Sequence, residues 1–585
     1  MATFENGGAI VADALARAGV RHLYTLCGGH ISPILVGAKA RGIRVVDVRD
    51  EAHAVFAADA TARMTGIPGV AAVTAGPGVT NAMTAIKNAQ MAQSPVLIFG
   101  GATATILKGR GSLQDIDQLS IMKPVTKWAA AISTVPALGP TVQKAIEVAQ
   151  SGIPGPVFLE VPVDLLYPEA TVRDWYVKES GVDKMKGVAG KAVGLYLKGH
   201  LYRQFHQPHV QLDLPVPDLD RVGFAALKDR DGQLDEVARE LRRAERPVLV
   251  IGNQTMVNCK DPEALAGAVR QLGVPTFLGG SARGLLGRSC PIQFRHNRSK
   301  ALKDADLVII AGFPFDFRLK YGMGIPKKGK IVAANLSATE LRKNRRPEIA
   351  VQMHAGDFLM RLAEKFGTGD FAEWVSTLKV AEDERDAQIA RDAKSTGPMV
   401  DPMHFFLRME EKMADDSILV ADGGDFVATG AYILRPRSPL SWLDPGVFGT
   451  LGVGGGFAVA SSIVRPEAET WLVWGDGSSA YSLSEIDTCV RHGLAPICVI
   501  GTDASWAQIA RDQITILGDD VGTCLLRTAY HKVAEGYGGV GLLLDDPAKT
   551  DEVLDEAKHH SKNGKPVVVN VHLAQSDFRK GSISI

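Results

Sequence analysis

The sequence predicts an α/β fold built from three doubly wound domains, each with a parallel sheet. The first supporting observation is length, because 585 residues are enough for several hydrophobic cores. The second is that short, β-branched apolar runs alternate with helical stretches, and glycines follow many of the runs. The third is that this alternation is interrupted twice, which divides it into three blocks.

The first block, residues 1–175, shows the alternation most clearly. Helices are expected at residues 8–18 and 52–64, and strands at residues 21–26, 43–48, 70–74, 96–99 and 157–161. Residues 176–225 are polar and rich in His, Pro and Asp, which predicts a linker with a helical piece near residues 193–200.

The second block, residues 226–365, predicts a central α/β domain with strands at residues 247–251, 276–278, 307–311 and 330–334. Residues 366–400 are charged and favour a helical linker. The third block, residues 401–585, has strands at residues 418–421, 470–474, 496–500 and 567–571. Its length and pattern match those of the first block, which predicts two related domains that flank a third.

Composition excludes several classes of partner. The chain carries 65 basic and 65 acidic side chains, so no overall field favours nucleic acid or a membrane surface, and we expect neither as a partner. The six cysteines form no CxxC pair and have no zinc-ligand spacing with histidine. The first residues lack the basic and apolar regions of a signal peptide. We therefore expect a cytoplasmic protein.

Two carboxylates follow two strands of the third block. Asp476 lies in a Gly-Asp-Gly-Ser run directly after one strand. Asp503, which is 27 positions after Asp476, directly follows the next strand. Ligands bind at this end of the strands in open α/β sheets, and two carboxylates there can hold Mg²⁺ against a diphosphate. The carbonyl of Ser505 is the expected third protein ligand. A Gly-Asp-Gly run that occurs without such a second ligand is more often a turn than a metal site.

Three further features have both a structural and a functional interpretation. Glu51 lies at a strand end before an alanine-rich helix, where an acidic residue also favours the helix dipole. Gly76-Pro77-Gly78 with Asn81 is consistent with a turn and a helix cap. The glycine-rich run around Leu451 is consistent with tight packing or with close approach of the backbone to a ligand.

Together these motifs resemble the thiamine-diphosphate enzymes that include acetolactate synthase, and the nearest resemblance is to the 2-hydroxyacyl-CoA lyases of that group. The resemblance extends over the whole chain, and the segments that carry it best are residues 28–33, 88–95, 422–427, 503–509 and 577–583. The group's metal signature usually ends in asparagine where this chain has Asp503, but the lyase subgroup often carries aspartate there. Aspartate keeps the oxygen ligand and adds a negative charge.

The resemblance implies roles for particular residues. Glu51 would act on the cofactor's aminopyrimidine, Leu451 would be the wedge between the cofactor's two rings, and Asp476, Asp503 and Ser505 would hold Mg²⁺. Other residues expected to contact the cofactor are Pro77, Asn81, Gly424, Asp425, Phe426, Thr450, Gly475, Gly477, Ser478 and Trp506. Candidates around the substrate are His30, Leu113, Gln114, Trp506 and Gln508, with His30 and Gln114 as catalytic candidates; packing roles are equally open for them.

The implied reaction is reversible cleavage of a 2-hydroxyacyl-CoA into formyl-CoA and an aldehyde or ketone. Acetolactate-type chemistry on pyruvate is the enzymatic alternative, and a non-catalytic cofactor-binding or regulatory protein is the other. Val163 stands where acetolactate synthases have a lysine near FAD, which makes FAD unexpected; ADP in the central domain stays open. Leu113-Gln114 replaces the Tyr-Glu of oxalyl-CoA decarboxylases. A homodimer or homotetramer with active sites at the subunit interface is implied.

Overall fold

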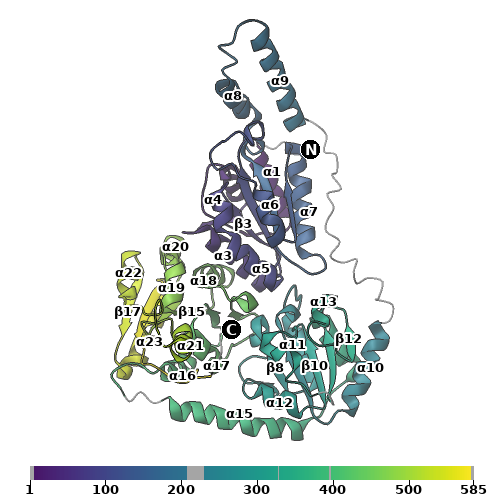
Figure 1. Ribbon diagram of the computed structural model, residues 1–585, viewed down its shortest axis with the longest axis vertical. Coiled ribbons are helices and arrows are strands. Elements are labelled where there is room, and N and C mark those ends of the chain that lie inside the picture. Colours follow the sequence, from purple (N-terminus) through teal and green to yellow (C-terminus); the bar gives the residue numbers. More distant parts are fainter. Residues whose placement is uncertain (1–5, 207–229, 327–328, 394–396, 582–585) are drawn as a thin grey trace. The chain divides into compact units, whose positions relative to one another are not determined.

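The computed structural model describes residues 6–206, 230–326, 329–393 and 397–581. The chain forms two compact units, residues 1–218 and 219–585. The first unit contains one six-stranded sheet and the second contains two (Figure 1). All strand pairs within these sheets are parallel, with helices between successive strands, so the predicted α/β class with three parallel sheets is confirmed.

The first sheet has the strand order β2-β1-β3-β4-β6-β5. Its strands are β1 (His22–Thr25), β2 (Arg44–Asp47), β3 (Gly69–Val73), β4 (Val96–Ala102), β5 (Trp128–Ala131) and β6 (Val157–Pro162). The helices around it include α1 (Gly7–Arg17), α2 (Ser32–Ala40), α3 (Glu51–Thr65), α4 (Pro77–Asn81), α5 (Met83–Ala92), α6 (Gln118–Met122) and α7 (Leu138–Gln150). β3 and β4 are buried along their whole length, as expected for central parallel strands.

The central sheet has the order β12-β11-β10-β7-β8-β9. It comprises β7 (Pro247–Ile251), β8 (Thr276–Leu278), β9 (Gln293–Phe294), β10 (Leu307–Ala311), β11 (Lys330–Ala334) and β12 (Ile349–Val351). Its helices are α10 (Arg230–Arg243), α11 (Pro262–Leu272), α12 (Arg298–Asp304), α13 (Ala338–Leu341) and α14 (Ala355–Phe366). When the six strands are numbered within this domain, their order is that of dinucleotide-binding folds.

The third sheet, β14-β13-β15-β16-β18-β17, repeats the order of the first. Its strands are β13 (Ile418–Ala421), β14 (Trp442–Leu443), β15 (Thr470–Gly475), β16 (Ile497–Thr502), β17 (Val540–Leu544) and β18 (Val567–His572). The helices are α16 (Pro402–Lys412), α17 (Asp425–Ile433), α18 (Val453–Val464), α19 (Asp476–Ser482), α20 (Glu485–His492), α21 (Ala507–Leu517), α22 (Tyr530–Gly536) and α23 (Thr550–Lys562).

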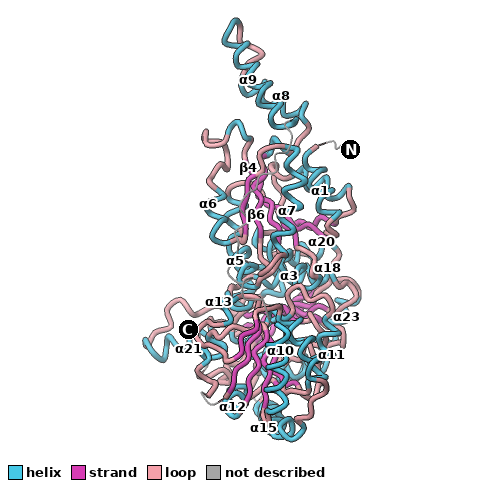
Figure 2. The backbone as a smooth tube through the Cα atoms, turned by 90° about the vertical axis from the view of Figure 1, so that its right-hand side faces the viewer, coloured by secondary structure: helices cyan, strands magenta, loops and turns pink. Residues whose placement is uncertain are grey.

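The two predicted linkers contain long helices. Residues 169–206 form a hairpin of α8 (Glu169–Ser180) and α9 (Gly187–His206), which we call the helical arm; residues 207–225 of that linker lie outside the described residues. In Figures 1 and 2 the arm extends away from the sheet of its own unit. Residues 366–400 contain α15 (Ala372–Asp392). Within the described residues, no helix is both long and apolar enough to cross a bilayer.

Candidate functional site

The end of the third sheet holds a cavity of about 240 Å³ at the point where the strand order reverses, between β13 and β15. The residues that line it come from four segments of the chain. They are Gly423, Gly424, Asp425, Phe426, Gly449, Leu451, Gly475, Asp476, Gly477, Ser478, Gly501, Asp503, Ser505, Trp506, Ala507, Gln508 and Ile509. Every cofactor residue proposed from the sequence of the third block lines this cavity except Thr450, whose hydroxyl donates to the carbonyl of Leu451 at 3.0 Å.

Asp476 and Asp503 approach each other across the cavity. Asp476 is almost fully buried, and its carboxylate accepts the backbone N–H of Gly477 and of Ala504, each at 2.8 Å. Burial raises the pKa of Asp476, and these N–H donors oppose the rise. Burial, followed by the Asp476 charge, raises the pKa of Asp503 to about 7. The charge of Arg527 opposes this rise only in part, so the site concentrates two carboxylates whose charges are not fully offset by the described residues.

This donor set fits Mg²⁺ with a diphosphate. A divalent cation prefers oxygen ligands and would relieve the repulsion that raises the pKa of Asp503. Glycine lets the backbone pack closely around the site: a Cβ on Gly477 would lie 2.5 Å from the Trp506 ring, and a Cβ on Gly475 would lie 3.0 Å from the carbonyl of Gly423. The start of α19 lines the same space, and the positive end of its helix dipole favours an anion.

A buried aspartate that the sequence reasoning did not select shapes the wedge loop. Asp422 accepts the backbone N–H groups of Gly452, at 3.0 Å, and Gly454, at 2.9 Å. These bonds fix the turn directly after Leu451. A Cβ on Gly423 would come within 2.2 Å of Cδ2 of Leu451, so the leucine occupies the space that this glycine leaves. The signal for Asp422 was its place at the end of a predicted strand.

The other wall of the cavity is charged. Asp425 begins α17, forms an ion pair with Arg511 and lies 3.8 Å from Nε of Arg579. Burial raises the pKa of Asp425, while the two arginines act against that rise. Residues 578 and 579 pack against α17, since the Phe578 ring lies edge-on to Tyr432 and the Arg579 guanidinium lies 5.0 Å from the same ring.

The first unit presents a separate group of predicted residues. Glu51 is the first residue of α3 and is 6 % exposed, and its Oε2 accepts a hydrogen bond from Nδ2 of Asn81 at 3.1 Å. Pro77 begins α4, and a Cβ on Gly78 would lie 3.3 Å from Oε1 of Glu51. The glycine turn therefore packs directly beside this carboxyl group, which pairs with an amide and not with a cation.

The substrate candidates of the first unit lie beside the same turn. His30 hydrogen-bonds the hydroxyl of Thr74 through Nδ1 at 3.2 Å, and burial lowers the pKa of its ring. Gln114 has a left-handed φ of 63°, and its backbone lies against Gly76. Leu113 is 83 % exposed. The loop thus presents one apolar side chain to its surroundings and packs its neighbour against the glycine turn.

A buried network that the sequence reasoning missed holds this loop. Gln118 accepts the N–H of Gly76 at 3.0 Å and donates to the carbonyl of Gly101 at 3.0 Å and to Glu160 at 3.1 Å. Glu160, which is 1 % exposed, also forms an ion pair with Lys108. The network ties the ends of β3, β4 and β6 to the loop that carries Leu113 and Gln114. A lone glutamine in an amphipathic stretch gives no sequence signal for such a role.

The second unit has a further cavity of about 560 Å³ at the end of β8 and β9, beside α17. Five cationic side chains line it and no carboxylate does; the cations are Arg283, Arg295, Arg298, Lys300 and Arg385. Burial lowers the pKa of Arg283 and of Arg298, and neighbouring arginines lower it further. This surface, which we call the basic pocket, is suited to an anion.

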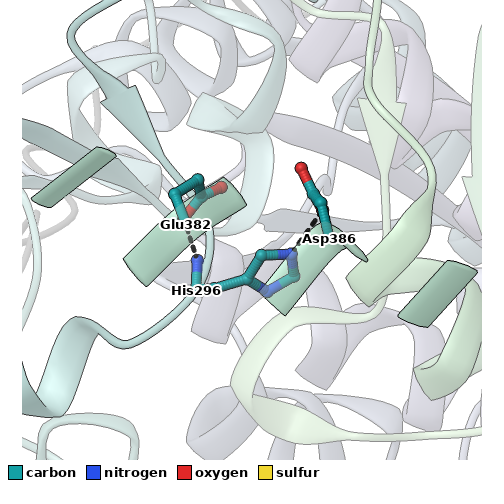
Figure 3. Close-up of side chains that lie close together, drawn as sticks. All are labelled: His296, Glu382 and Asp386. Atoms are coloured by element: carbon teal, nitrogen blue, oxygen red, sulfur yellow. Dashed lines mark hydrogen bonds and ion pairs between the residues drawn. The ribbon is translucent and has the colours of Figure 1, made fainter. Parts of the chain in front are cut away.

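Three potential metal ligands, His296, Glu382 and Asp386, lie together beside the basic pocket (Figure 3). Glu382 accepts the backbone N–H of His296 at 2.9 Å, and Asp386 accepts hydrogen bonds from the His296 ring and from Arg295. Burial would raise the pKa of Asp386, but His296 and two arginines, Arg295 and Arg435, hold it at about 2. Because hydrogen bonds and ion pairs with these partners already occupy the carboxylates, the cluster has a structural role and joins α15 to its neighbours.

Comparison with known families identifies all three domains. The N-terminal TPP binding domain of thiamine pyrophosphate enzymes matches residues 5–121, the central domain matches residues 234–362, and the C-terminal TPP binding domain matches residues 422–571. These matches cover more than half of the chain and follow the order of the three sheets.

Curated relatives match over nearly the full length. A protein named 2-hydroxyacyl-CoA lyase 2 from Danio rerio is 46 % identical over 99 % of this chain and 93 % of its own. The protein of the same name from Homo sapiens is 44 % identical over 100 % and 92 %. A probable acetolactate synthase from Mycobacterium bovis is 31 % identical over 97 % and 95 %.

Proposed function

Because the chain belongs to the thiamine pyrophosphate enzyme family, we propose that it is a Mg²⁺- and thiamine-diphosphate-dependent lyase that cleaves 2-hydroxyacyl-CoA into formyl-CoA and an aldehyde or ketone. The observation that carries the substrate class is the 44–46 % identity, over the whole chain, with proteins named 2-hydroxyacyl-CoA lyase 2. Acetolactate synthase relatives are more distant, at 31 %. The compartment stays a prediction.

The bound cofactor would supply a nucleophilic carbon that stabilises negative charge during carbon–carbon cleavage. In our proposal Asp476, Asp503 and the Ser505 carbonyl hold Mg²⁺, and Leu451 supports the cofactor from below. Glu51 hydrogen-bonds the aminopyrimidine, and the Asn81 amide that now contacts its Oε2 orients this carboxyl group. His30, Gln114 and Gln508 are the polar groups proposed near the substrate.

The basic pocket supports an acyl-CoA substrate, because CoA carries three phosphate groups and cationic side chains line the pocket without a carboxylate. Arg295 and Lys300 form ion pairs with Asp386 and Asp304 outside the lining. The cations proposed to meet the phosphates are therefore Arg283, Arg298 and Arg385. Arg283 donates to the carbonyl of Ala431 at 2.8 Å and lies 4.6 Å from the Trp442 ring, which leaves its charge without an acidic partner among the lining residues. We assign the phosphates of CoA to this pocket and leave ADP in the central domain as an untested alternative; FAD stays unexpected.

The assay that tests the lyase proposal measures formyl-CoA release from a 2-hydroxyacyl-CoA with thiamine diphosphate and Mg²⁺ present, and then with each omitted. We expect turnover only in the complete mixture. Glu51→Gln keeps the shape of the side chain but removes its acid–base function, so we expect turnover to fall by about 10²–10⁴-fold with cofactor binding retained. Unchanged turnover would remove Glu51 from its proposed role.

Acetolactate-type chemistry is the second candidate, favoured only by the 31 % relatives. Pyruvate offered as the sole substrate, with and without FAD, separates the two activities. Acetolactate formation that outpaces formyl-CoA release would overturn the lyase assignment. A non-catalytic binding or regulatory protein would turn over neither substrate, and calorimetry that shows no binding of thiamine diphosphate would favour this alternative.

We also propose that the enzyme is at least a homodimer in which Glu51 of one chain serves the diphosphate site of its partner. Mixing denatured Glu51→Gln and Asp476→Ala chains and refolding them tests this arrangement. Each mixed dimer would then contain one intact site, so the mixture should recover about a quarter of wild-type activity. If each chain supplied its own whole site, the mixture would stay inactive.

A further inference from the structure

The helical arm has a second apolar face that its own unit does not cover. The inner face of α9 packs on α8 through Leu197 and Leu201, which join a small core with Val172 and Tyr176. On the opposite side of α9, Val188, Leu195 and Tyr202 recur every seven residues and are 84 %, 73 % and 64 % exposed. This spacing places them in one stripe along the helix.

The stripe continues through small residues and ends at the tip of the hairpin. Ala192 and Gly199, also seven residues apart and exposed, lie between the larger side chains of the stripe. Met185, in the turn between the two helices, is 47 % exposed, and Tyr196 borders the stripe at 52 %. α9 is therefore apolar on two opposite faces, only one of which is packed.

Positive charge surrounds this stripe. α9 contains no acidic residue, and its exposed cations are Lys191, Lys198 and Arg203; the turn before it adds Lys184 and Lys186. Asp183 is the only carboxylate between residues 181 and 206. The chain as a whole is neutral, so this is a local concentration of charge that the overall composition conceals.

The arm is held firmly by its base. Asp164, which is fully buried, accepts the backbone N–H of Thr105 at 3.0 Å, the Gln204 amide at 2.6 Å and the Tyr176 hydroxyl. One carboxylate thus joins α8, α9 and the loop after β4. The stripe therefore lies on a helix that is already folded and anchored, so binding does not require the helix to fold first.

From these features we propose that the helical arm binds the surface of an anionic membrane, with the α9 stripe in the lipid interface and the lysines near the headgroups. Exposed Leu, Val and Tyr on one face, with Lys and Arg beside them, is the pattern of helices that lie in that interface. A second copy of the arm fits less well, because stripe-to-stripe pairing would bring the lysines of both copies together. The overall neutrality of the chain favours no membrane partner, whereas the local charge of the arm leads to the opposite inference for its surface.

Vesicle flotation of the full-length protein tests the proposal independently of any enzymatic activity. We expect at least tenfold more protein on vesicles of phosphatidylcholine and phosphatidylglycerol in equal parts than on phosphatidylcholine alone, with the difference reduced by added salt. The double variants Leu195→Gln/Tyr202→Gln and Lys191→Gln/Lys198→Gln should each lose about tenfold of this binding. All four side chains are exposed, so both variants should keep lyase turnover and circular dichroism.

Matched substitutions on another surface provide the control. Val380 on α15 is 70 % exposed, and Lys562 ends α23; the double variant Val380→Gln/Lys562→Gln makes the same kinds of change and should bind vesicles like the wild type. Equal binding of the wild type to both vesicle types, or full binding by the arm variants, overturns the proposal. A fall in molar mass of the arm variants by light scattering, with no vesicle effect, would instead assign the stripe to a second copy of this chain.

Discussion

The first and third sheets have the same strand order but opposite electrostatic designs at the ends of their equivalent strands. In the third sheet, Asp476 and Asp503 follow β15 and β16, and the charge of Arg527 offsets them only in part, so the pKa of Asp503 rises to about 7. In the first sheet, the equivalent strands β3 and β4 are followed by Thr74 and Thr103 and not by aspartates, and the buried Glu160 of β6 is neutralised by Lys108 and hydrogen-bonded to Gln118. An uncompensated buried charge indicates where a ligand belongs, whereas a compensated one indicates a structural support.

The largest effect is expected when one carboxylate of the pair Asp476 and Asp503 is removed. Asp476→Ala removes the more buried carboxylate, so cofactor binding with Mg²⁺ and lyase turnover should fall by at least about 10³-fold. Asp503→Asn is the matched change, because it keeps an oxygen ligand and removes only the charge; calorimetry should show Mg²⁺-dependent cofactor binding within about tenfold of wild type. Equal losses in the two variants would mean that charge, and not ligand geometry, governs the site.

The next largest effect is expected at Gly423, whose missing side chain leaves the space that Leu451 occupies. A Cβ at Gly423 would lie 2.2 Å from Cδ2 of Leu451, so Gly423→Ala should displace the leucine and lower turnover by about 10–100-fold. Gly267→Ala is the control, since a Cβ there meets no atom within 4 Å. Adding Leu451→Ala to Gly423→Ala should restore thermal stability but not turnover. Recovery of both would show that the wedge is dispensable.

A smaller effect is expected at the compensated site of the first sheet. Gln118→Leu leaves the N–H of Gly76, the carbonyl of Gly101 and Glu160 without this partner, which should cost about 1–3 kcal/mol of unfolding free energy. Because the loop with Leu113 and Gln114 loses its anchor, KM for acyl-CoA should rise more than kcat falls. Gln143→Leu, on the exposed side of α7, is the control and should leave urea unfolding and kinetics unchanged. A fall in kcat with KM constant would contradict this role.

The same contrast explains what the sequence could predict. Thirteen strands were expected, and the five that were missed, β5, β9, β12, β14 and β17, all lie at sheet edges. Edge strands are short or partly exposed, as in the two-residue β9 and β14, so they lack the continuous apolar runs that identify central strands. Residues 176–225 were expected to be mainly linker because the amphipathic pattern of α9 is obscured by its two apolar faces.

Site residues follow a similar division. Asp476 and Asp503 occupy motifs at strand ends, and Leu451 lies in a glycine-rich run just before α18, so their gathering around one cavity follows from local sequence and parallel topology. Gln118 and Glu160 meet only through tertiary packing and belong to no motif, and the basic pocket combines arginines from three separate segments. Spacing along the chain carries no signal for such long-range pairs.

The smallest effect concerns pH. In the native apoprotein the pKa of Asp503 is raised to about 7 from its usual value near 3.8, so between these values the native state retains a proton that the unfolded chain has lost. Stability of the apoprotein should therefore fall as pH rises through this range, and each kcal/mol corresponds to about 2–4 °C in Tm. Asp503→Asn should flatten the dependence of Tm on pH between pH 5 and 8 in EDTA, whereas the exposed control Asp416→Asn should not. Saturating Mg²⁺ and thiamine diphosphate should reverse the trend in the wild type, because binding requires the ionised carboxylate. A wild-type slope that survives in Asp503→Asn would place the titrating group elsewhere and weaken the distinction between the two sheets.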